Sequence, residues 1–191
     1  AGPLLELLRR REAKDGDDEK KKVVFYSSPF SRARQTAGAC LDGLFEDWGE
    51  EVESMGLDVR RDIIIEDDLM ERWFGRLDDE KLYTYAYVWP NDLFDVTHTA
   101  FDVESVAAVA TRISDLIRRI EDRHTDDDDG AIVVLTSHAD VLQITQVYAA
   151  GAENVGTFSE YRFGNGEVRL MGRSVDSLPE PKPLVPPKKG T

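Results

Sequence analysis

Two kinds of hydrophobic pattern alternate along the chain. Short apolar runs predict β-strands at 23–27, 59–66 and 131–136. Apolar residues at helical spacing predict helices over 4–11, 31–48, 103–120 and 139–150. The run 131–136 is apolar on both faces, which is typical of a central parallel strand covered by helices on both sides. Strands that alternate with helices indicate an α/β fold with a mostly parallel sheet.

Three segments depart from this alternation. Residues 157–163 and 167–171 flank Gly164-Asn165-Gly166, a pattern that predicts a C-terminal β-hairpin. Residues 78–102 are rich in aromatics and without clear periodicity, which indicates a lid or a partly helical segment, or aromatics that only pack against the core. A proline-rich stretch favours an extended tail over 175–191, after one domain at 1–174. The acidic run 126–129 lacks the spacing of a calcium loop and indicates a solvated turn.

Composition excludes several function classes. A net charge of −14 argues against nucleic acid and against anionic membrane surfaces as partners. No apolar run approaches the length of a membrane span, so membrane insertion is not expected. The one cysteine, Cys40, cannot form an internal disulfide and occupies an apolar helix position, where a small buried side chain is expected. This favours a reducing intracellular compartment, but the compartment stays open because a targeting segment would precede Ala1.

A candidate anion site lies at 27–37, where the strand at 23–27 leads into a helix. A helix N-terminus there offers backbone N–H groups and the positive end of the helix dipole. Arg32 adds a planar, permanently charged group that suits phosphate oxygens. The alternative is an ordinary helix start, with Ser31 as the capping residue and the arginines in solvent. Arg34, two residues further along, is expected to face away from the site.

Two further segments place chemistry after apolar runs. Glu71 and Arg72 follow the strand at 59–66, and Ser137-His138-Ala139 follows the strand at 131–136. With Ser28-Pro29-Phe30-Ser31-Arg32-Ala33-Arg34-Gln35-Thr36-Ala37, these segments resemble the motifs of the histidine phosphatase (phosphoglycerate-mutase-like) family. The family's motifs are Ser-Pro-Leu-x-Arg-Ala-x-Gln-Thr-Ala, Glu-Arg-x-x-Gly and Ser-His-Gly, in the same order, and the likeness runs from about residue 4 to residue 172.

The resemblance implies a fold and a set of roles. It implies a three-layer α/β/α sandwich with no metal and no cofactor. Arg32, His138 and Ala139 would contact the transferring phosphoryl group, and Glu71 would protonate the leaving oxygen. The alternatives are a satisfied core histidine for His138 and a surface glutamate paired with Arg72 for Glu71. His98 and His124 belong to no motif and are expected at the surface.

The family's Arg-His-Gly segment, whose His takes the phosphoryl group, occurs nowhere in this sequence. The chain as given is therefore expected to be inactive alone, and the strand at 131–136 would lack a neighbour. A separate segment or a protein partner would then supply that strand. Two hypotheses follow: the complete protein is a phosphatase that works through phosphohistidine, or a phosphatase-like domain serves as a scaffold in a larger assembly.

The aromatic segment bears on the substrate. Residues 82–111 contain no Lys or Arg, whereas a mutase must hold an anionic substrate at both ends. Tyr83, Tyr87 and Trp89 are candidate lid residues that would accept an apolar or aromatic leaving group. The expected partner is accordingly a phosphorylated small molecule or a phosphoprotein.

Overall fold

The computed structural model describes residues 1–15, 21–125 and 131–184, and the chain divides into two compact units. The first unit comprises Ala1–Met70, Leu116–Ser137 and Asn165–Leu170. The second comprises Glu71–Asp115, His138–Gly164 and Met171–Thr191. The predicted acidic turn at 126–129 and the last prolines of the predicted tail lie outside the described residues.

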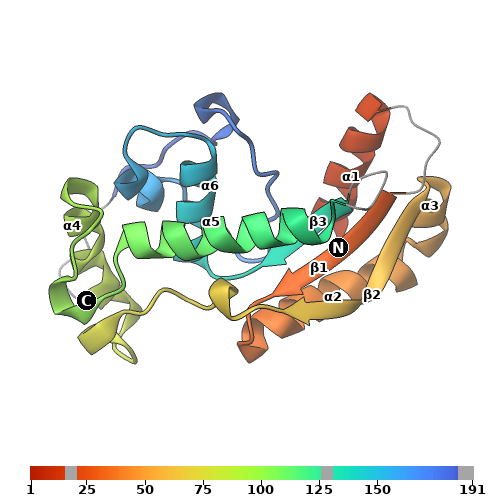
Figure 1. Cartoon of the computed structure of the whole chain (residues 1–191). Coiled ribbons are helices and arrows are strands. Elements are labelled where there is room, and N and C mark those ends of the chain that lie inside the picture. The colour runs from red at the N-terminus through yellow and green to blue at the C-terminus, as the bar shows by residue number, and fades with distance from the viewer. Residues whose placement is uncertain (16–20, 126–130, 185–191) are drawn as a thin grey trace. The chain divides into compact units, whose positions relative to one another are not determined.

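The first unit is built on a three-stranded parallel sheet in the order β2-β1-β3 (Figure 1). Its strands are β1 (Lys21–Ser27), β2 (Leu57–Ile65) and β3 (Ala131–Thr136). The register pairs Val23 with Ile132 and Ser27 with Thr136. Within the described residues β3 pairs only with β1, so its second edge carries backbone groups that no described strand satisfies. The predicted parallel α/β architecture is confirmed, as are the three predicted strands.

Helices cover both faces of this sheet. On one face lie α1 (Gly2–Asp15), α2 (Ser31–Glu46) and α3 (Gly49–Ser54). The side chains of this core come from all three helices and two strands: Leu4, Leu5, Leu8, Val23, Phe25, Leu41, Leu44, Val52 and Val59. Cys40 is half-buried against the same core. The other face, which bears the buried Tyr26, is covered by the last turns of α5 (Val106–Arg123) (Figure 1).

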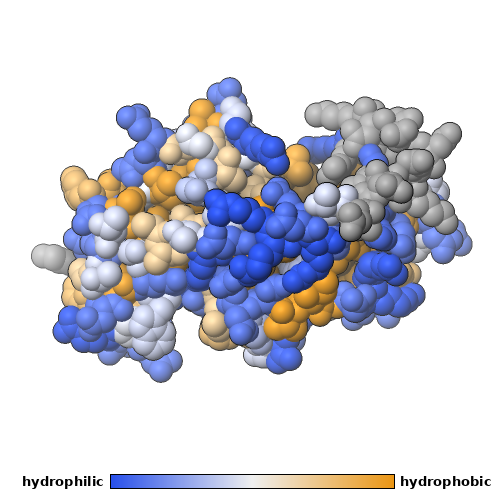
Figure 2. Space-filling view, in the orientation of Figure 1, coloured by the Kyte–Doolittle hydropathy of each residue, from blue (hydrophilic) through white to orange (hydrophobic). Residues whose placement is uncertain are grey.

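The outward side of α5 is polar. Its last turns carry exposed charged residues, and the surface over them is hydrophilic in Figure 2: Arg118, Arg119, Glu121 and Asp122. The inward residues Leu116 and Ile120 are buried. This division between faces is the amphipathic pattern that predicted the helix, which begins three residues later than its apolar pattern does.

Short helices dominate the second unit. The predicted lid segment folds into η3 (Leu82–Tyr87), α4 (Trp89–Phe94) and η4 (Ala100–Asp102), so it is partly helical as expected. Further elements are η2 (Gly75–Leu77), η5 (Val155–Glu160), η6 (Val175–Ser177) and α6 (Ala139–Ala149), while η1 (Asp67–Leu69) belongs to the first unit. Phe74 stacks on Tyr85 with 3.8 Å between ring centroids, and Phe74 is buried with Val88 and Val103.

The predicted C-terminal hairpin is wrong. Residues 155–160 form η5 instead of a strand, and residues 167–171 have no regular structure. Phe158 is fully buried, and a Cβ atom on Gly156 would lie 2.1 Å from the carbonyl oxygen of Asp92. Close packing against α4 therefore determines the backbone here. The Gly-Asn-Gly turn survives locally, with φ of +68° at Gly166, but an isolated hairpin has little stability without a sheet edge to extend.

The described part of the proline-rich segment is tied to the second unit. The backbone N–H of Lys182 donates to the carbonyl oxygen of Glu160 over 2.8 Å, and Arg162 donates to the carbonyl oxygen of Pro183. The domain boundary at 174 stays a prediction. No helix in the described ranges combines the length and apolar character that a membrane crossing requires.

Candidate functional site

The first candidate segment lies at the carboxyl end of β1. The backbone N–H of Ser28 donates to the carbonyl oxygen of Thr136, which holds the ends of β1 and β3 together. The N-cap of α2 is Phe30, which makes no side-chain capping bond, so the alternative in which Ser31 caps the helix is wrong. Arg32 lies in the first turn, exposed, with its guanidinium 4.9 Å from the centroid of the Phe30 ring. Arg34 is also exposed.

The second candidate segment forms the start of α6. His138 is the N-cap residue, with an extended backbone, and its carbonyl oxygen accepts from the N–H of Leu142. Its imidazole is only 4 % exposed. Ala139 follows it as the first helical residue and is exposed. An imidazole at a helix N-terminus lies beside the positive end of the helix dipole, where an anion is stabilised.

Glu71 and His138 form a pair across 67 positions of sequence. The distance from Glu71 Oε2 to His138 Nδ1 is 3.6 Å, an ion-pair separation longer than a hydrogen bond. The other oxygen, Glu71 Oε1, accepts from the backbone N–H of Arg72 over 3.1 Å. The Glu71 side chain is 28 % exposed, so it can meet solvent or a ligand while it contacts a buried imidazole. The alternative in which Glu71 is a surface residue paired with the Arg72 guanidinium is wrong.

Arg72 instead lies at the centre of a buried network that was not predicted from the sequence. Its guanidinium is completely buried and donates two hydrogen bonds of 2.7 Å to the carboxylate of Asp92. The Arg72 Nε–H donates to the carbonyl oxygen of Glu104, also over 2.7 Å. Asp140, in the first turn of α6, lies 3.8 Å from the same guanidinium. A hint was available in the sequence, because Arg72 precedes two large aromatics that could shield it.

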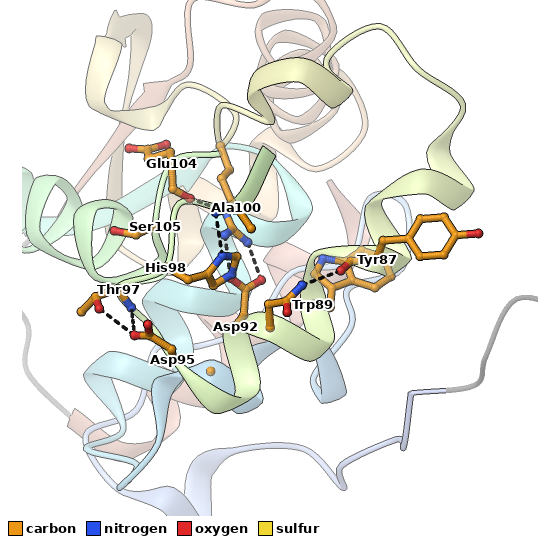
Figure 3. A network of polar contacts seen from close by, with 12 residues as sticks. Tyr87, Trp89, Asp92, Asp95, Thr97, His98, Ala100, Glu104 and Ser105 are labelled. Carbon is orange, nitrogen blue, oxygen red and sulfur yellow. Dashed lines mark hydrogen bonds and ion pairs between the residues drawn. The ribbon is translucent and has the colours of Figure 1, made fainter. Parts of the chain in front are cut away.

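His98 belongs to this network, so its predicted surface position is wrong. In Figure 3 His98 and Asp92 point toward one another, and His98 Nε2 lies 2.7 Å from Asp92 Oδ1. The other ring nitrogen, Nδ1, accepts from the backbone N–H of Ala100. An imidazole that accepts at Nδ1 and donates at Nε2 is the neutral tautomer, so His98 completes the hydrogen bonding of Asp92 without adding charge.

Asp140 is the carboxylate of the network that titrates near neutrality. Burial raises its pKa to about 6, against the opposing effects of the Arg72 charge and of a 3.1 Å hydrogen bond from Trp89 Nε1. Asp92 is the nearby negative charge that adds to the rise. Above about pH 6 Asp140 therefore adds a negative charge to the cluster, and below that pH its carboxyl is mainly neutral.

His124 is likewise not a free surface residue. In the first unit its Nε2 lies 2.9 Å from the hydroxyl of the fully buried Tyr26, and Arg123 donates to the same hydroxyl. The prediction failed because the side chain that contacts His124, Tyr26, comes from β1, which lies about a hundred positions earlier in the sequence.

The candidate lid residues divide into two kinds. Tyr83 and Tyr87 are more than half exposed. Trp89 is half-buried, and its indole N–H is committed to Asp140. No group of three or more His, Cys, Asp and Glu side chains within the described residues is arranged to hold a metal ion. Because Arg32 belongs to the first unit and Glu71 and His138 to the second, convergence of Arg32 and His138 on one anion stays a prediction.

Comparison with known proteins identifies a family for most of the chain. The sequence model of the histidine phosphatase superfamily (branch 1) matches residues 11–176. No curated protein matches the chain. One similar solved structure is mycobacterial hydrolase 2, at 20 % identity and a TM-score of 0.50 over 91 % of this chain and 70 % of that one.

Two other structures are similar at lower scores. Mycobacterial glucosyl-3-phosphoglycerate phosphatase, solved with inorganic phosphate, has 19 % identity and a TM-score of 0.49 over 74 % of this chain and 65 % of its own. The alpha-ribazole phosphatase of Shigella flexneri has 18 % identity and a TM-score of 0.47 over 89 % and 82 %. The likeness to mycobacterial hydrolase 2, at 20 % identity, supports the fold and no more.

Proposed function

We propose that this chain, which belongs to the histidine phosphatase superfamily, is the larger part of an enzyme that hydrolyses phosphoric monoesters. The observation that carries the proposal is the Glu71–His138 pair. It puts a carboxyl group that can exchange protons beside an imidazole at a helix N-terminus. Phosphoryl transfer needs mainly charge stabilisation and positioning, and these groups offer both.

The reaction has two steps. A histidine nitrogen of the Arg-His-Gly segment, supplied from outside the 191 residues, attacks phosphorus while the bond to the leaving oxygen breaks. Glu71 gives its proton to that oxygen, and His138 and Arg32 hold the phosphoryl oxygens. A water molecule then attacks the phosphohistidine, Glu71 takes a proton from this water, and the histidine and inorganic phosphate are released.

The second edge of β3 is the place we assign to the missing segment. The β3 backbone pairs with β1 on one side only within the described residues, and all six of its residues are half-buried. An apolar strand that ends in Arg-His-Gly and runs parallel to β3 would satisfy the open edge. It would also deliver its histidine to the same end of the sheet as Ser137.

Turnover of an aryl phosphate tests the proposal. The 191-residue chain alone should give none, because no nucleophilic histidine is available for the covalent route. The same chain with an N-terminal extension that forms a strand and ends in Arg-His-Gly should gain turnover, and His138→Ala in that extended chain should abolish it. Turnover by the unextended chain that depends on His138 would contradict the proposed role of the extension.

Anion binding tests the assignment of Arg32. Calorimetric titration with phosphate or vanadate should detect binding to the unmodified chain and weaker binding to Arg32→Ala. Arg34→Ala is the matched control, because Arg34 is exposed in the same helix and its replacement removes the same charge. Equal losses in the two variants would reduce the effect to general electrostatics and contradict a specific role for Arg32.

The lid segment supports a phosphatase rather than a phosphoglycerate mutase. Residues 82–111, which include most of the lid segment, contain no Lys or Arg, and the Tyr83 and Tyr87 side chains are exposed. Such a surface suits an aromatic or apolar leaving group and repels a second anionic group on the substrate. In the extended chain, hydrolysis of aryl or phosphoprotein substrates should exceed mutase flux on 3-phosphoglycerate. Efficient mutase activity would contradict this assignment.

The absence of Arg-His-Gly from the sequence favours a second candidate function, a scaffold that uses the same domain without turnover. In that case a partner protein covers the open edge of β3 without supplying a histidine. The sequence upstream of Ala1 in the native transcript discriminates between the two. An apolar strand that ends in Arg-His-Gly favours the enzyme, and its absence favours the scaffold.

A further inference from the structure

We infer that Arg72 is a positioning residue, and that it holds Glu71 against His138 through its contacts with Asp92 and Asp140. The inference rests on the proposed function of the Glu71–His138 pair. It assigns a task to a cluster whose central pair, Arg72 and Asp92, is completely buried.

The segment that carries Glu71 has no regular structure of its own and is tied down at Arg72 and Trp73. The Arg72 Nε–H donates to the carbonyl oxygen of Glu104, and the N–H of Glu104 donates back to the carbonyl oxygen of Trp73. The N–H of Trp73 lies 3.3 Å from Glu104 Oε2, which also receives a hydrogen bond from Arg112. The peptide after Glu71 is thus fixed against the residues that precede α5.

The helix that carries His138 is connected to the same guanidinium. Asp140 is two residues after His138, and its Oδ2 lies 3.8 Å from Arg72 Nη1 while it accepts from Trp89 Nε1. Asp92 fixes the orientation of the guanidinium by two parallel hydrogen bonds, and His98 holds Asp92. A bidentate pair between planar groups restricts both position and angle, so a movement of the Glu71 segment relative to α4 would break it. The guanidinium is thereby held at the distance from which it attracts Asp140 on α6.

The alternative is that the cluster only stabilises the second unit. The chain offers a direct way to separate the two, because it contains three histidines, in three different surroundings. His138 reports on the pair, His98 on the buried network, and His124 on the hydroxyl of Tyr26 in the first unit. Long-range ¹H–¹⁵N NMR spectra follow the titration and tautomer of each imidazole in the intact chain, without any need for turnover.

The experiment is a double-mutant cycle on the titration midpoint of His138. Glu71→Gln is measured in the unmodified chain and in Arg72→Lys, which keeps the charge but loses the fork geometry. A positioning role predicts that Glu71→Gln lowers the midpoint in the unmodified chain, and by less than half as much in Arg72→Lys. Equal shifts in the two backgrounds would overturn the inference, because Glu71 would then reach His138 without help from Arg72.

Asp140→Asn provides the second background, since an asparagine oxygen can still accept from Trp89 and the fold is therefore retained. In this background too, Glu71→Gln should shift the His138 midpoint by a smaller amount. If Asp140 acted on His138 only through its charge, the shifts caused by Asp140→Asn and by Glu71→Gln would instead be additive. Arg76→Gln is the control, because it breaks an ion pair of the same unit, with Asp102, that touches neither Glu104 nor Asp140. It should leave the Glu71→Gln shift of His138 unchanged. The titration midpoint of His124 should be the same in every variant. If the NMR titrations show the coupling but the extended chain shows no phosphatase turnover, Arg72 still positions Glu71 against His138, and only the proposed function is contradicted.

Discussion

Replacing Arg72 by Met should destabilise the second unit by about 3–5 kcal/mol, which is the usual cost of removing one partner of a buried ion pair. The structure places the change at the upper part of that range. Arg72 is completely buried, makes three hydrogen bonds of 2.7 Å and lies between two carboxylates, Asp92 and Asp140. Met has a similar volume, so the loss comes from the carboxylates left without a cation rather than from a cavity.

This loss should depend on pH, and the sign follows from proton binding. The Arg72 charge lowers the pKa of Asp140 against the effect of burial, so without that cation the buried Asp140 carboxyl keeps its proton to higher pH in the folded state than in the unfolded state. A folded state that binds more protons loses stability as pH rises, so the cost of Arg72→Met should be larger at pH 8 than at pH 5. Adding Asp92→Asn to Arg72→Met should restore at least half of the lost free energy of unfolding at pH 8.

Urea unfolding measures both effects. Trp73 and Trp89 lie in the second unit, and in a Trp48→Phe background the tryptophan fluorescence reports on that unit alone. A loss below about 1 kcal/mol at pH 8, or the same loss at pH 5 and pH 8, would refute the view that Arg72 neutralises buried carboxylates.

Three further changes test other parts of the structure. Asp140→Asn should flatten the pH dependence of unfolding, because a carboxyl whose pKa is raised from 3.8 to about 6 costs the folded state about 2 kcal/mol as pH rises from 4 to 7, and chemical denaturation at both pH values measures the difference. Tyr26→Phe should cost about 1 kcal/mol through loss of the hydrogen bonds with His124 and Arg123, and unchanged stability would mean that water replaces the hydroxyl. Gln143→Met should raise the free energy of unfolding by about 1–3 kcal/mol, because Gln143 Oε1 is buried and has no hydrogen-bond partner among the described residues, and a lower melting temperature would contradict this.

The sheet was predictable because its signals are local. The apolar runs at 23–27 and 131–136 are long enough to identify buried strands, and the polar residues just after them are where a parallel sheet presents its chemistry. The separate roles expected for Glu71 and His138 came from the resemblance of motifs and their order, and the structure places the two side chains 3.6 Å apart. Neither inference required knowledge of the packing between segments.

The buried network and the C-terminal segment were not predictable for the opposite reason. Arg72, Asp92 and His98 read as polar residues in an irregular stretch, and only the fold brings them together with the apolar rings of Phe74 and Phe158. The Gly-Asn-Gly sequence predicts a turn correctly but not what the flanking residues pair with. The burial of Phe158 favours a helical turn at this position, where the sequence predicted a strand.

The position of β1 in the middle of the sheet has a consequence for how the chain acquires its structure during synthesis. β2 follows β1 within about 40 residues, but β3 follows it by over a hundred, since Val23 pairs with Ile132. Half of the hydrogen bonds of the central strand therefore wait until residue 136 has left the ribosome. During that interval the apolar side chains of β1 and the open edge beside it are exposed to other chains. Variants that slow the closing of this long-range pairing should lower the yield of folded protein more than they lower its final stability, because the vulnerable species is the nascent sheet.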